Sequence, residues 1–180
     1  SKMIGERLLL SYKKYIDLVI LRPATVCGYS PSMRLDVAVN ALTFGALKNK
    51  KIKVFGGKQI RPNLHMADMI KAYKFFINRK LKKNKTSDQT IFNVGFENIS
   101  ILNIAKTINK IIKAKSKILV QKSNDPRSYR QNSDRLLKLG FKKDKSINVA
   151  IKEIEEQFYK KNVRYNKKFY RINTLKIINN

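Results

Sequence analysis

The chain has 180 residues, 43% of them hydrophobic, which suffices for the core of one ordinary domain and excludes a wholly disordered chain. No apolar run is long enough to cross a bilayer, and the first residues carry no signal-peptide pattern, so a membrane span is not expected. The 40 Lys and Arg residues against 12 Asp and Glu residues give a formal net charge of +28, an excess that raises the question of an anionic partner.

The first elements in chain order are a helix and a strand. Apolar residues near helical spacing predict the end of a helix over residues 2–15. Residues 16–21 form a continuous apolar run, typical of a strand buried on both faces of a parallel sheet. Pro23 and Gly28 then predict that the strand stops and that a loop covers residues 23–31. Ligands bind at such strand-to-loop switches in α/β sheets.

The middle of the chain predicts two helices and a strand between them. Residues 36–47 carry one apolar stripe at helical spacing. Residues 52–55 alternate apolar residues with lysine and end at Gly56-Gly57, which indicates a strand followed by a turn. Residues 66–77 have strong helical periodicity.

The last part of the chain repeats this alternation after a polar, lysine-rich surface loop over residues 80–88. Ser100 and Ser146 are suited to cap the helices that follow them, and Gly140 to end a short helix. The apolar patterns predict strands over residues 91–94 and 118–120 and helices over residues 101–111, 134–139 and 147–158.

Strands that alternate with helices indicate the α/β class with a parallel sheet. The apolar strand over residues 16–21 needs neighbouring strands on both sides and helices on both faces. The sequence contains no glycine-rich phosphate loop, and we find no internal repeat or low-complexity linker. The pattern therefore predicts part of an α/β fold whose upstream section is missing.

Several motifs resemble those of the NAD-dependent nucleotide-sugar epimerases and dehydratases, which are extended short-chain dehydrogenase/reductases. In that family the active-site helix carries Tyr-x-x-x-Lys, and the next strand ends in an Arg-Pro-x-x-Val-x-Gly loop. The matching segments occur here in the family's order: Ser1-Lys2, Arg22-Pro23-Ala24-Thr25-Val26-Cys27-Gly28, Arg61 with His65 and Asp68, Asn93-Val94-Gly95, Asp125-Pro126-Arg127 and Leu139-Gly140-Phe141.

The resemblance covers residues 1–158 and implies the C-terminal portion of the epimerase/dehydratase domain, without its N-terminal dinucleotide-binding half. Residues 159–180 would be a basic C-terminal extension. The implied fold is the last part of a Rossmann-like parallel sheet with the smaller substrate-binding α/β subdomain. The implied activity is hydride transfer at a sugar carbon through a keto intermediate. The isolated chain lacks the tyrosine and is expected to be inactive, and the full-length protein is expected to form a homodimer.

The resemblance implies NAD, rather than NADP, as the cofactor. Lys2 would be the catalytic lysine, which would bind the nicotinamide ribose and lower the pKa of the family's tyrosine because a nearby cation favours the phenolate. The segment Pro23, Ala24, Thr25 and Val26 would line the nicotinamide end, mainly through backbone groups. From position alone, Lys2 is also explained as an ordinary solvated lysine.

The resemblance also implies a nucleotide-sugar substrate. Arg61, on a loop just beyond two glycines, would bind the diphosphate, because a planar guanidinium grips phosphate oxygens in pairs. Asp125 and Arg127 would contact the ribose and phosphates of the nucleotide. Lys122 stands where some relatives carry arginine, so it keeps the charge and loses the paired donors. Arg61 is otherwise explained as a surface arginine that caps a turn.

Two further polar residues, Asp36 and Asn40, lie where the substrate loop of the family enters its helix and are expected to touch the sugar. Asp36 is equally suited to cap that helix. His65 and Asp68 are expected to order a loop-to-helix junction rather than to bind a metal. Cys27, the only cysteine, is expected to be a small buried hydrophobe, and its isolation fits a reducing cytoplasm.

The excess of positive charge leaves a second interpretation, a basic protein that binds nucleic acid or an anionic surface on an α/β remnant. The charge is spread along the chain and is mainly lysine, which shares A- and T-rich codons with the abundant isoleucine and asparagine. A basic enzyme surface is therefore expected, and nucleic acid is not expected as a partner. The aromatic and basic tail, with Tyr159, Tyr165, Phe169 and Tyr170, suits either a single-strand platform or packing on its own domain, and we expect the packing.

Overall fold

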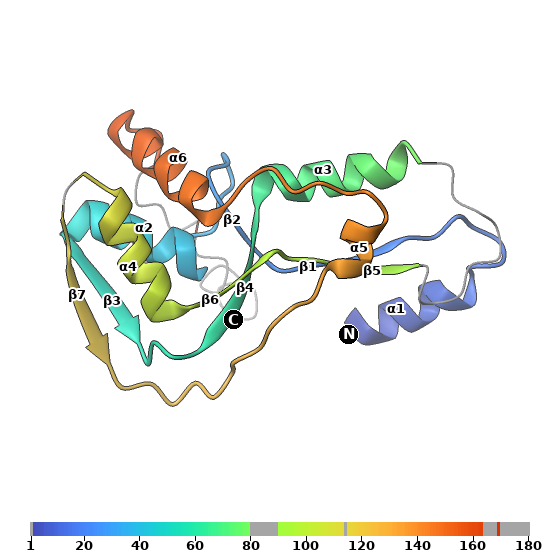
Figure 1. Cartoon of the computed structure of the whole chain (residues 1–180), viewed down its shortest axis with the longest axis horizontal. Helices are drawn as coiled ribbons and strands as arrows, with labels where there is room; N and C mark the ends of the chain where they lie inside the picture. The colour runs from blue at the N-terminus through green and yellow to red at the C-terminus, as the bar shows by residue number, and fades with distance from the viewer. Residues whose placement is uncertain (1, 80–89, 114, 164–168, 170–180) are drawn as a thin grey trace, which may run out of the picture.

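Two lobes lie along the long axis of the molecule and are joined by a short central sheet (Figure 1). The structure, a computed structural model, describes residues 2–79, 90–113, 115–163 and 169. The predicted loop over residues 80–88 therefore lies outside the described residues. We name the lobes by their strand pairs, the β1–β5 lobe and the β3–β7 lobe.

The β1–β5 lobe is built on two parallel strands, with Ile20 opposite Ile91 and Pro23 opposite Val94. Helix α3 packs on the strands through Phe76, whose ring lies 4.9 Å from that of Phe92. The elements of this lobe are α1 (Lys2–Ser11), β1 (Ile20–Pro23), α3 (Met66–Ile77), β5 (Ile91–Val94) and α5 (Asp134–Lys138).

The β3–β7 lobe is built on a second parallel pair, with Lys51 opposite Lys117 and Phe55 opposite Gln121. Its three helices enclose an isoleucine-rich core that includes Ile52, Ile104 and Ile108. The elements of this lobe are α2 (Ala38–Asn49), β3 (Lys51–Phe55), α4 (Ile101–Ile111), β7 (Lys117–Gln121) and α6 (Ile147–Tyr159).

The central sheet has three strands in the order β2-β4-β6, with bounds Thr25–Cys27, Ile60–His65 and Glu97–Ser100. Strand β2 runs parallel to β4, and β6 runs antiparallel to it. Strand β4 leads directly into α3, and β6 leads directly into α4, so the central sheet connects the two lobes. The chain is thus a mixed α/β protein with parallel strand pairs, as predicted.

Strands β4 and β6 were not predicted from the sequence. The sequence of β4 has no alternation and contains Pro62, which lacks the N–H that a ladder needs. Pro62 pairs only with Asn98 of β6, because the ladder between β2 and β4 begins at Asn63. The proline is therefore tolerated at the stretch of β4 that has one neighbour.

The predictions for the first strand and loop were partly wrong. The strand is β1, which ends at Pro23 as expected but begins only at Ile20, and in the described chain only Ile20 of this strand is buried. Residues 23–31 are not a continuous loop, because Thr25–Cys27 form β2 after a one-residue break at Ala24. The Ala24 N–H still donates to Val94 O at 2.8 Å, so the break does not disturb the edge of β5.

The capping predictions had mixed outcomes. Ser100 caps α4 as predicted, since its hydroxyl accepts from the Asn103 N–H. Ser146 precedes α6 but makes no side-chain cap hydrogen bond. Asp36 is not the cap of α2; Val37 holds that position without a side-chain bond. Among the described residues, no helix is both long and apolar enough to cross a membrane.

Candidate functional site

Arg61, Asp125 and Arg127 form one cluster, although Arg61 and Asp125 are 64 positions apart. Arg61 Nη2 lies 3.1 Å from Asp125 Oδ2, and Arg127 binds the same carboxylate through Nε at 2.7 Å and Nη2 at 2.8 Å. The Arg61 guanidinium also lies over the ring of Tyr129, 5.5 Å from its centre. The structure therefore brings these three predicted site residues together.

Backbone contacts hold this cluster in place. Arg61 stands on β4 and not on a loop, which corrects the sequence prediction. Its Nη1 donates to the carbonyl oxygen of Arg127 and, at 3.1 Å, to that of Ile60. The Ile60 N–H donates to Ser128 Oγ at 3.0 Å, and the Tyr129 N–H returns to Ile60 O at 3.3 Å. The start of β4 and the segment after β7 are thus tied to each other.

The Asp125 carboxylate is stabilised in its ionised form. Hydrogen bonds from the Arg127 side chain and then from its N–H hold the pKa of Asp125 well below its usual range, and the charge of Arg61 acts in the same direction. Two guanidinium groups and one carboxylate leave the cluster one net positive charge. Arginines of this kind, with planar paired donors, suit a phosphate group.

The segment Pro23–Val26 runs from the end of β1 into the central sheet, where Thr25 and Val26 belong to β2. Thr25 pairs with Asn63, which follows Arg61 by two residues, roughly 6–7 Å along β4. Gly95 allows the end of β5 to approach this segment, since a Cβ there would lie 2.5 Å from the Ala24 Cβ. Strand β4 therefore links the predicted cofactor segment to the predicted substrate cluster.

Two residues that the sequence did not single out flank this segment. Asn63 Oδ1 and Gln131 Oε1 are buried, and neither has a hydrogen-bond partner among the described residues. The other end of each amide is engaged, Asn63 with the carbonyl oxygen of Arg61 at 2.8 Å and Gln131 with that of Arg22 at 2.7 Å. An unpaired buried acceptor costs about 1–3 kcal/mol and calls for an explanation such as a ligand. Only the fold reveals them.

Lys2 is exposed at the start of α1. Glu6, one helical turn later and on the same face, pairs with Arg22 of β1, with Oε2 and Nη2 2.5 Å apart. The start of α1 lies on the side toward which β1 ends (Figure 1). The binding of the nicotinamide ribose by Lys2 stays a prediction.

Asp36 and Asn40 are engaged within the chain. Asp36 forms a two-point ion pair with Arg34, at 2.8 and 3.0 Å. Asn40 is buried on α2, where its Oδ1 accepts from the Gly28 N–H at 3.1 Å and its Nδ2 donates to Arg34 O at 3.0 Å. Asn40 thus positions the segment after β2, and its contact with a sugar stays a prediction.

The residues around Gly28 are structural. Gly28 has a φ of +104°, and a Cβ there would lie 3.2 Å from His65 Nε2. His65 caps α3 by accepting from the Ala67 N–H, as predicted, and its Nε2 lies 3.1 Å from Glu153 Oε2 of α6. Burial raises the pKa of the Cys27 thiol to about 12, with the charges of Glu97 and Glu153 as smaller causes. Cys27 is therefore a buried thiol and not a nucleophile.

The model of the family described as "NAD dependent epimerase/dehydratase family" matches residues 1–95, more than half of the chain. The chain belongs to this family. A curated relative from Bacillus subtilis (strain 168), described as an uncharacterized UDP-glucose epimerase, is 33% identical over 114 residues, which are 62% of this chain and 34% of the relative.

Solved structures show the same fold. The UDP-glucuronic acid 4-epimerase of Bacillus cereus, in complex with UDP-glucuronic acid and NAD, is 25% identical with a TM-score of 0.71, over 88% of this chain and 51% of that one. The UDP-glucose 4-epimerase of Thermotoga maritima is 20% identical with a TM-score of 0.72, over 89% and 52%. The chain therefore spans about half the length of these solved relatives, and its fold is that of part of a Rossmann-like enzyme.

Proposed function

We propose that the chain is the C-terminal portion of an NAD-dependent nucleotide-sugar epimerase or dehydratase and forms the substrate side of its active site. The observation that carries the proposal is the cluster of Arg61, Asp125 and Arg127, a preformed set of paired donors that strand β4 links to the Pro23–Val26 segment. The family supports the reaction class, and the UDP-sugar complexes of solved relatives support the substrate class.

In this proposal Arg61 binds the diphosphate of the nucleotide, because it is the best-held guanidinium of the cluster. Its side chain is 15% exposed, against 76% for Arg127, so it loses less freedom when a phosphate binds. Arg127 adds a second, more mobile pair of donors. Asp125 keeps both guanidinium groups oriented and would accept from a ribose hydroxyl.

The residues present fit the nicotinamide end of NAD. The segment Pro23–Val26 is partly open, and the unpaired buried oxygens of Asn63 and Gln131 flank it with acceptors. Bound NAD would supply a hydride acceptor and donor at a sugar carbon. Lys2 would bind the nicotinamide ribose and lower the pKa of the tyrosine of the family through its charge.

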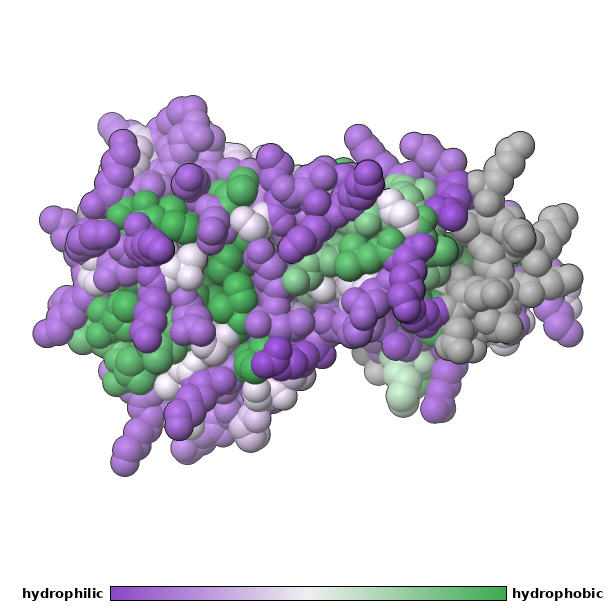
Figure 2. Space-filling model, viewed as in Figure 1, coloured by the Kyte–Doolittle hydropathy of each residue, from purple (hydrophilic) through white to green (hydrophobic). Residues whose placement is uncertain are grey.

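The rest of the enzyme would cover an apolar surface of the β1–β5 lobe. On α1, Met3 and Leu8 are about 60% exposed, and β1 pairs on one side only among the described strands. A hollow of about 560 Å³ between β1 and α3 is lined by residues that include Leu21 and Tyr73. Figure 2 shows hydrophobic residues at the surface there. A preceding Rossmann half is the partner that this surface fits.

The proposal is tested by titrating UDP into the chain with NMR or calorimetric detection. We expect saturable binding and a loss of at least tenfold in affinity for Arg61→Gln, because the variant loses a charge-assisted pair of donors. The matched control is Arg130→Gln, an exposed arginine of the same segment, for which we expect less than a twofold change.

The reaction itself is tested by joining the chain to an upstream dinucleotide-binding half that ends in the tyrosine motif. We expect the joined protein to bind NAD and to turn over a UDP-, GDP-, CDP- or dTDP-sugar. Equal effects of Arg61→Gln and Arg130→Gln would refute the diphosphate role of Arg61. A joined protein that binds NAD but converts none of these sugars would refute the substrate class.

A further inference from the structure

Acidic residues are absent from two long stretches of the sequence. Residues 37–67 and 98–124 contain no Asp or Glu, while each stretch holds six Lys or Arg residues. The first stretch forms α2 and β3, and the second forms α4 and β7. Because β3 pairs with β7, the fold places the two acid-free stretches side by side. The neighbouring strands β3 and β7 therefore carry lysines and no acidic residue.

The outer end of the β3–β7 lobe carries a surface of exposed lysines from both stretches. Lys51 and Lys117 are neighbours across the strand pair, and the Lys117 N–H donates to Lys50 O at 3.0 Å. Hydrophilic side chains project around this end of the molecule (Figure 2). We call it the lysine surface; its members are Lys50, Lys51, Lys53, Lys113, Lys115 and Lys117, all exposed.

This arrangement works against the stability of the isolated chain. No ion pair with a described acid neutralises any of the six lysines. The nearby Glu155 is buried and accepts from the Lys113 N–H at 2.8 Å, so it is occupied as a backbone acceptor. Like charges on neighbouring strands repel each other. Helix C-termini account for Lys50 and Lys113, but the strand lysines are not explained in this way.

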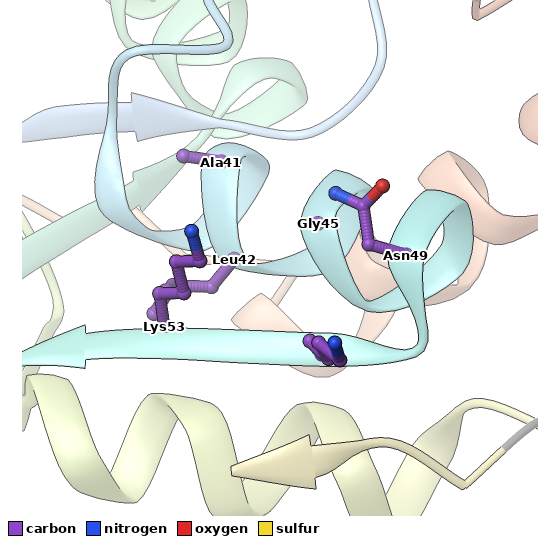
Figure 3. Close-up of a pocket in the computed structure, with 6 residues that line it drawn as sticks. Ala41, Leu42, Gly45, Asn49 and Lys53 are labelled. Carbon is purple, nitrogen blue, oxygen red and sulfur yellow. The ribbon is translucent and has the colours of Figure 1, made fainter. Parts of the chain in front are cut away.

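A groove continues the lysine surface between α2 and β3. It has a volume of about 620 Å³ and is lined by Ala41, Leu42, Gly45, Asn49, Lys51 and Lys53. Figure 3 shows the Lys53 side chain rising from β3 toward α2, on the side of Leu42. A concave, basic groove of this kind admits a chain of phosphates, whereas a flat bilayer does not enter it.

A membrane contact uses an extended apolar face. Among the described residues, the large exposed hydrophobic side chains of this strand pair are Phe55 and Val120, both near the carboxyl ends of the strands, whereas Lys51 and Lys117 lie at the starts. Phe55 alone shares the exposed face of β3 with Lys51 and Lys53, which is less than an apolar face. The six charged side chains of this surface are all lysines, compact point charges that suit phosphate oxygens and lack the planar paired donors of arginine. These side chains favour a partner with repeated phosphates, which they would bind without recognising particular bases.

We propose that the lysine surface binds the phosphate backbone of a nucleic acid without selecting its sequence. The contacts are electrostatic, and counterion release supplies their free energy. The sequence-based expectation that nucleic acid is not a partner is untested, and this proposal departs from it because β3 and β7 carry neighbouring lysines and no acidic residue. The proposed site is formed by β3, β7 and the ends of α2 and α4, apart from the Arg61 cluster, so it is independent of the proposed enzymatic function.

The test is fluorescence anisotropy of the full chain with labelled 20-mers of two unrelated sequences, over a range of salt concentrations. We expect equal affinity for both sequences and a steep salt dependence. Changing Lys51, Lys53, Lys113, Lys115 and Lys117 to Gln should lower the affinity for duplex 20-mers at least tenfold and reduce the salt slope by about 4–5, since each lost phosphate contact removes about 0.9.

The matched control changes five exposed lysines outside this surface to Gln and so alters the net charge equally: Lys13, Lys14, Lys138, Lys142 and Lys143. We expect less than a threefold loss for this variant. Equal losses for the two variants, or no binding by the wild-type chain at low salt, would overturn the proposal, as would binding to phosphatidylserine vesicles alone. Lysine acylation of the wild-type chain gives a check without mutation, because the nucleic acid should protect the lysine surface and leave the control lysines reactive.

Discussion

The β3–β7 lobe and the β1–β5 lobe bury their apolar residues to different extents. Ile52 and Ile108 in the first lobe have no exposed surface, and three helices pack around them. In the second lobe, α1 has no buried residue and Ile77 of α3 is 79% exposed. The first lobe is closed by its own residues, whereas the second has a core on one side and an apolar surface on the other. The hydrophobic pattern of the sequence does not tell which lobe is closed and which keeps an exposed apolar surface.

The comparison of the lobes predicts that replacing an isoleucine by alanine changes the free energy of unfolding much more in the closed core than at the exposed surface. Ile108→Ala should lower the free energy of unfolding by about 2–5 kcal/mol, because it leaves a cavity in a closed core. Ile77→Ala should change it by less than about 0.5 kcal/mol, because that side chain is exposed. Urea denaturation followed by circular dichroism measures both. Comparable losses would mean that the two lobes do not differ as described.

The connection between the lobes predicts an intermediate effect. Asp68 of α3 is buried and accepts from the N–H groups of Asp144 and Lys145, which lead into α6. Asp68→Ala should lower the free energy of unfolding by about 1–3 kcal/mol, because it removes two hydrogen bonds to a buried carboxylate and leaves two partly buried N–H groups without that partner. The control is Asp144→Ala, which removes an exposed ion pair with Lys71 and should cost less than about 1 kcal/mol.

A chevron analysis of the Asp68→Ala variant would sharpen the comparison further. If the contact forms late in folding, as expected for a link between two separately packed lobes, the variant should unfold faster with little change in its folding rate. A change confined to the folding rate would instead make this contact part of the nucleus.

The smallest effect concerns the pH response of the Arg61 cluster. The pKa of Asp125 is lowered, first by its hydrogen bonds from Arg127, so its stabilising contribution is present above the ordinary value of 3.8 and is lost as the pH falls through the lower folded value. Arg127→Gln should raise this pKa toward 3.8, and Arg130→Gln should leave it unchanged. Carbon-13 NMR of the Asp125 carboxyl measures both, and an unshifted pKa in the Arg127 variant would contradict the geometry.

Local patterns predicted the helices better than the central sheet. The periodicity of residues 66–77 matches α3, and Ser100 marks the start of α4. Strand β4 was missed because its residues suit tertiary contacts and not a local strand pattern. His65 caps a helix, and Asn63 donates to backbone carbonyl oxygens. Pro62 lies where β4 has one neighbouring strand. A pattern of local hydrophobicity carries none of these three requirements.

The sequence predicted which residues belong to the candidate site, but it did not predict how they contact one another. Arg61, Asp125 and Arg127 were chosen by resemblance, and their contact depends on the pairing of β4 with a distant segment. Asn40 was read as a possible ligand contact, but its amide serves the backbone of Gly28 and Arg34. The acceptors of Asn63 and Gln131 became visible only when the fold showed which polar atoms it leaves unpaired.

The exposure of α1 has a consequence for how Lys2 is positioned. A ten-residue helix is only marginally stable in water unless packing supports it, and α1 buries none of its residues in the described chain. Its ion pair from Glu6 to Arg22 lies at the surface, where dissolved ions weaken it. We therefore expect α1 to melt and reform while both cores stay intact. The precision with which Lys2 is held is set by whatever packs on α1 and not by the fold of this chain.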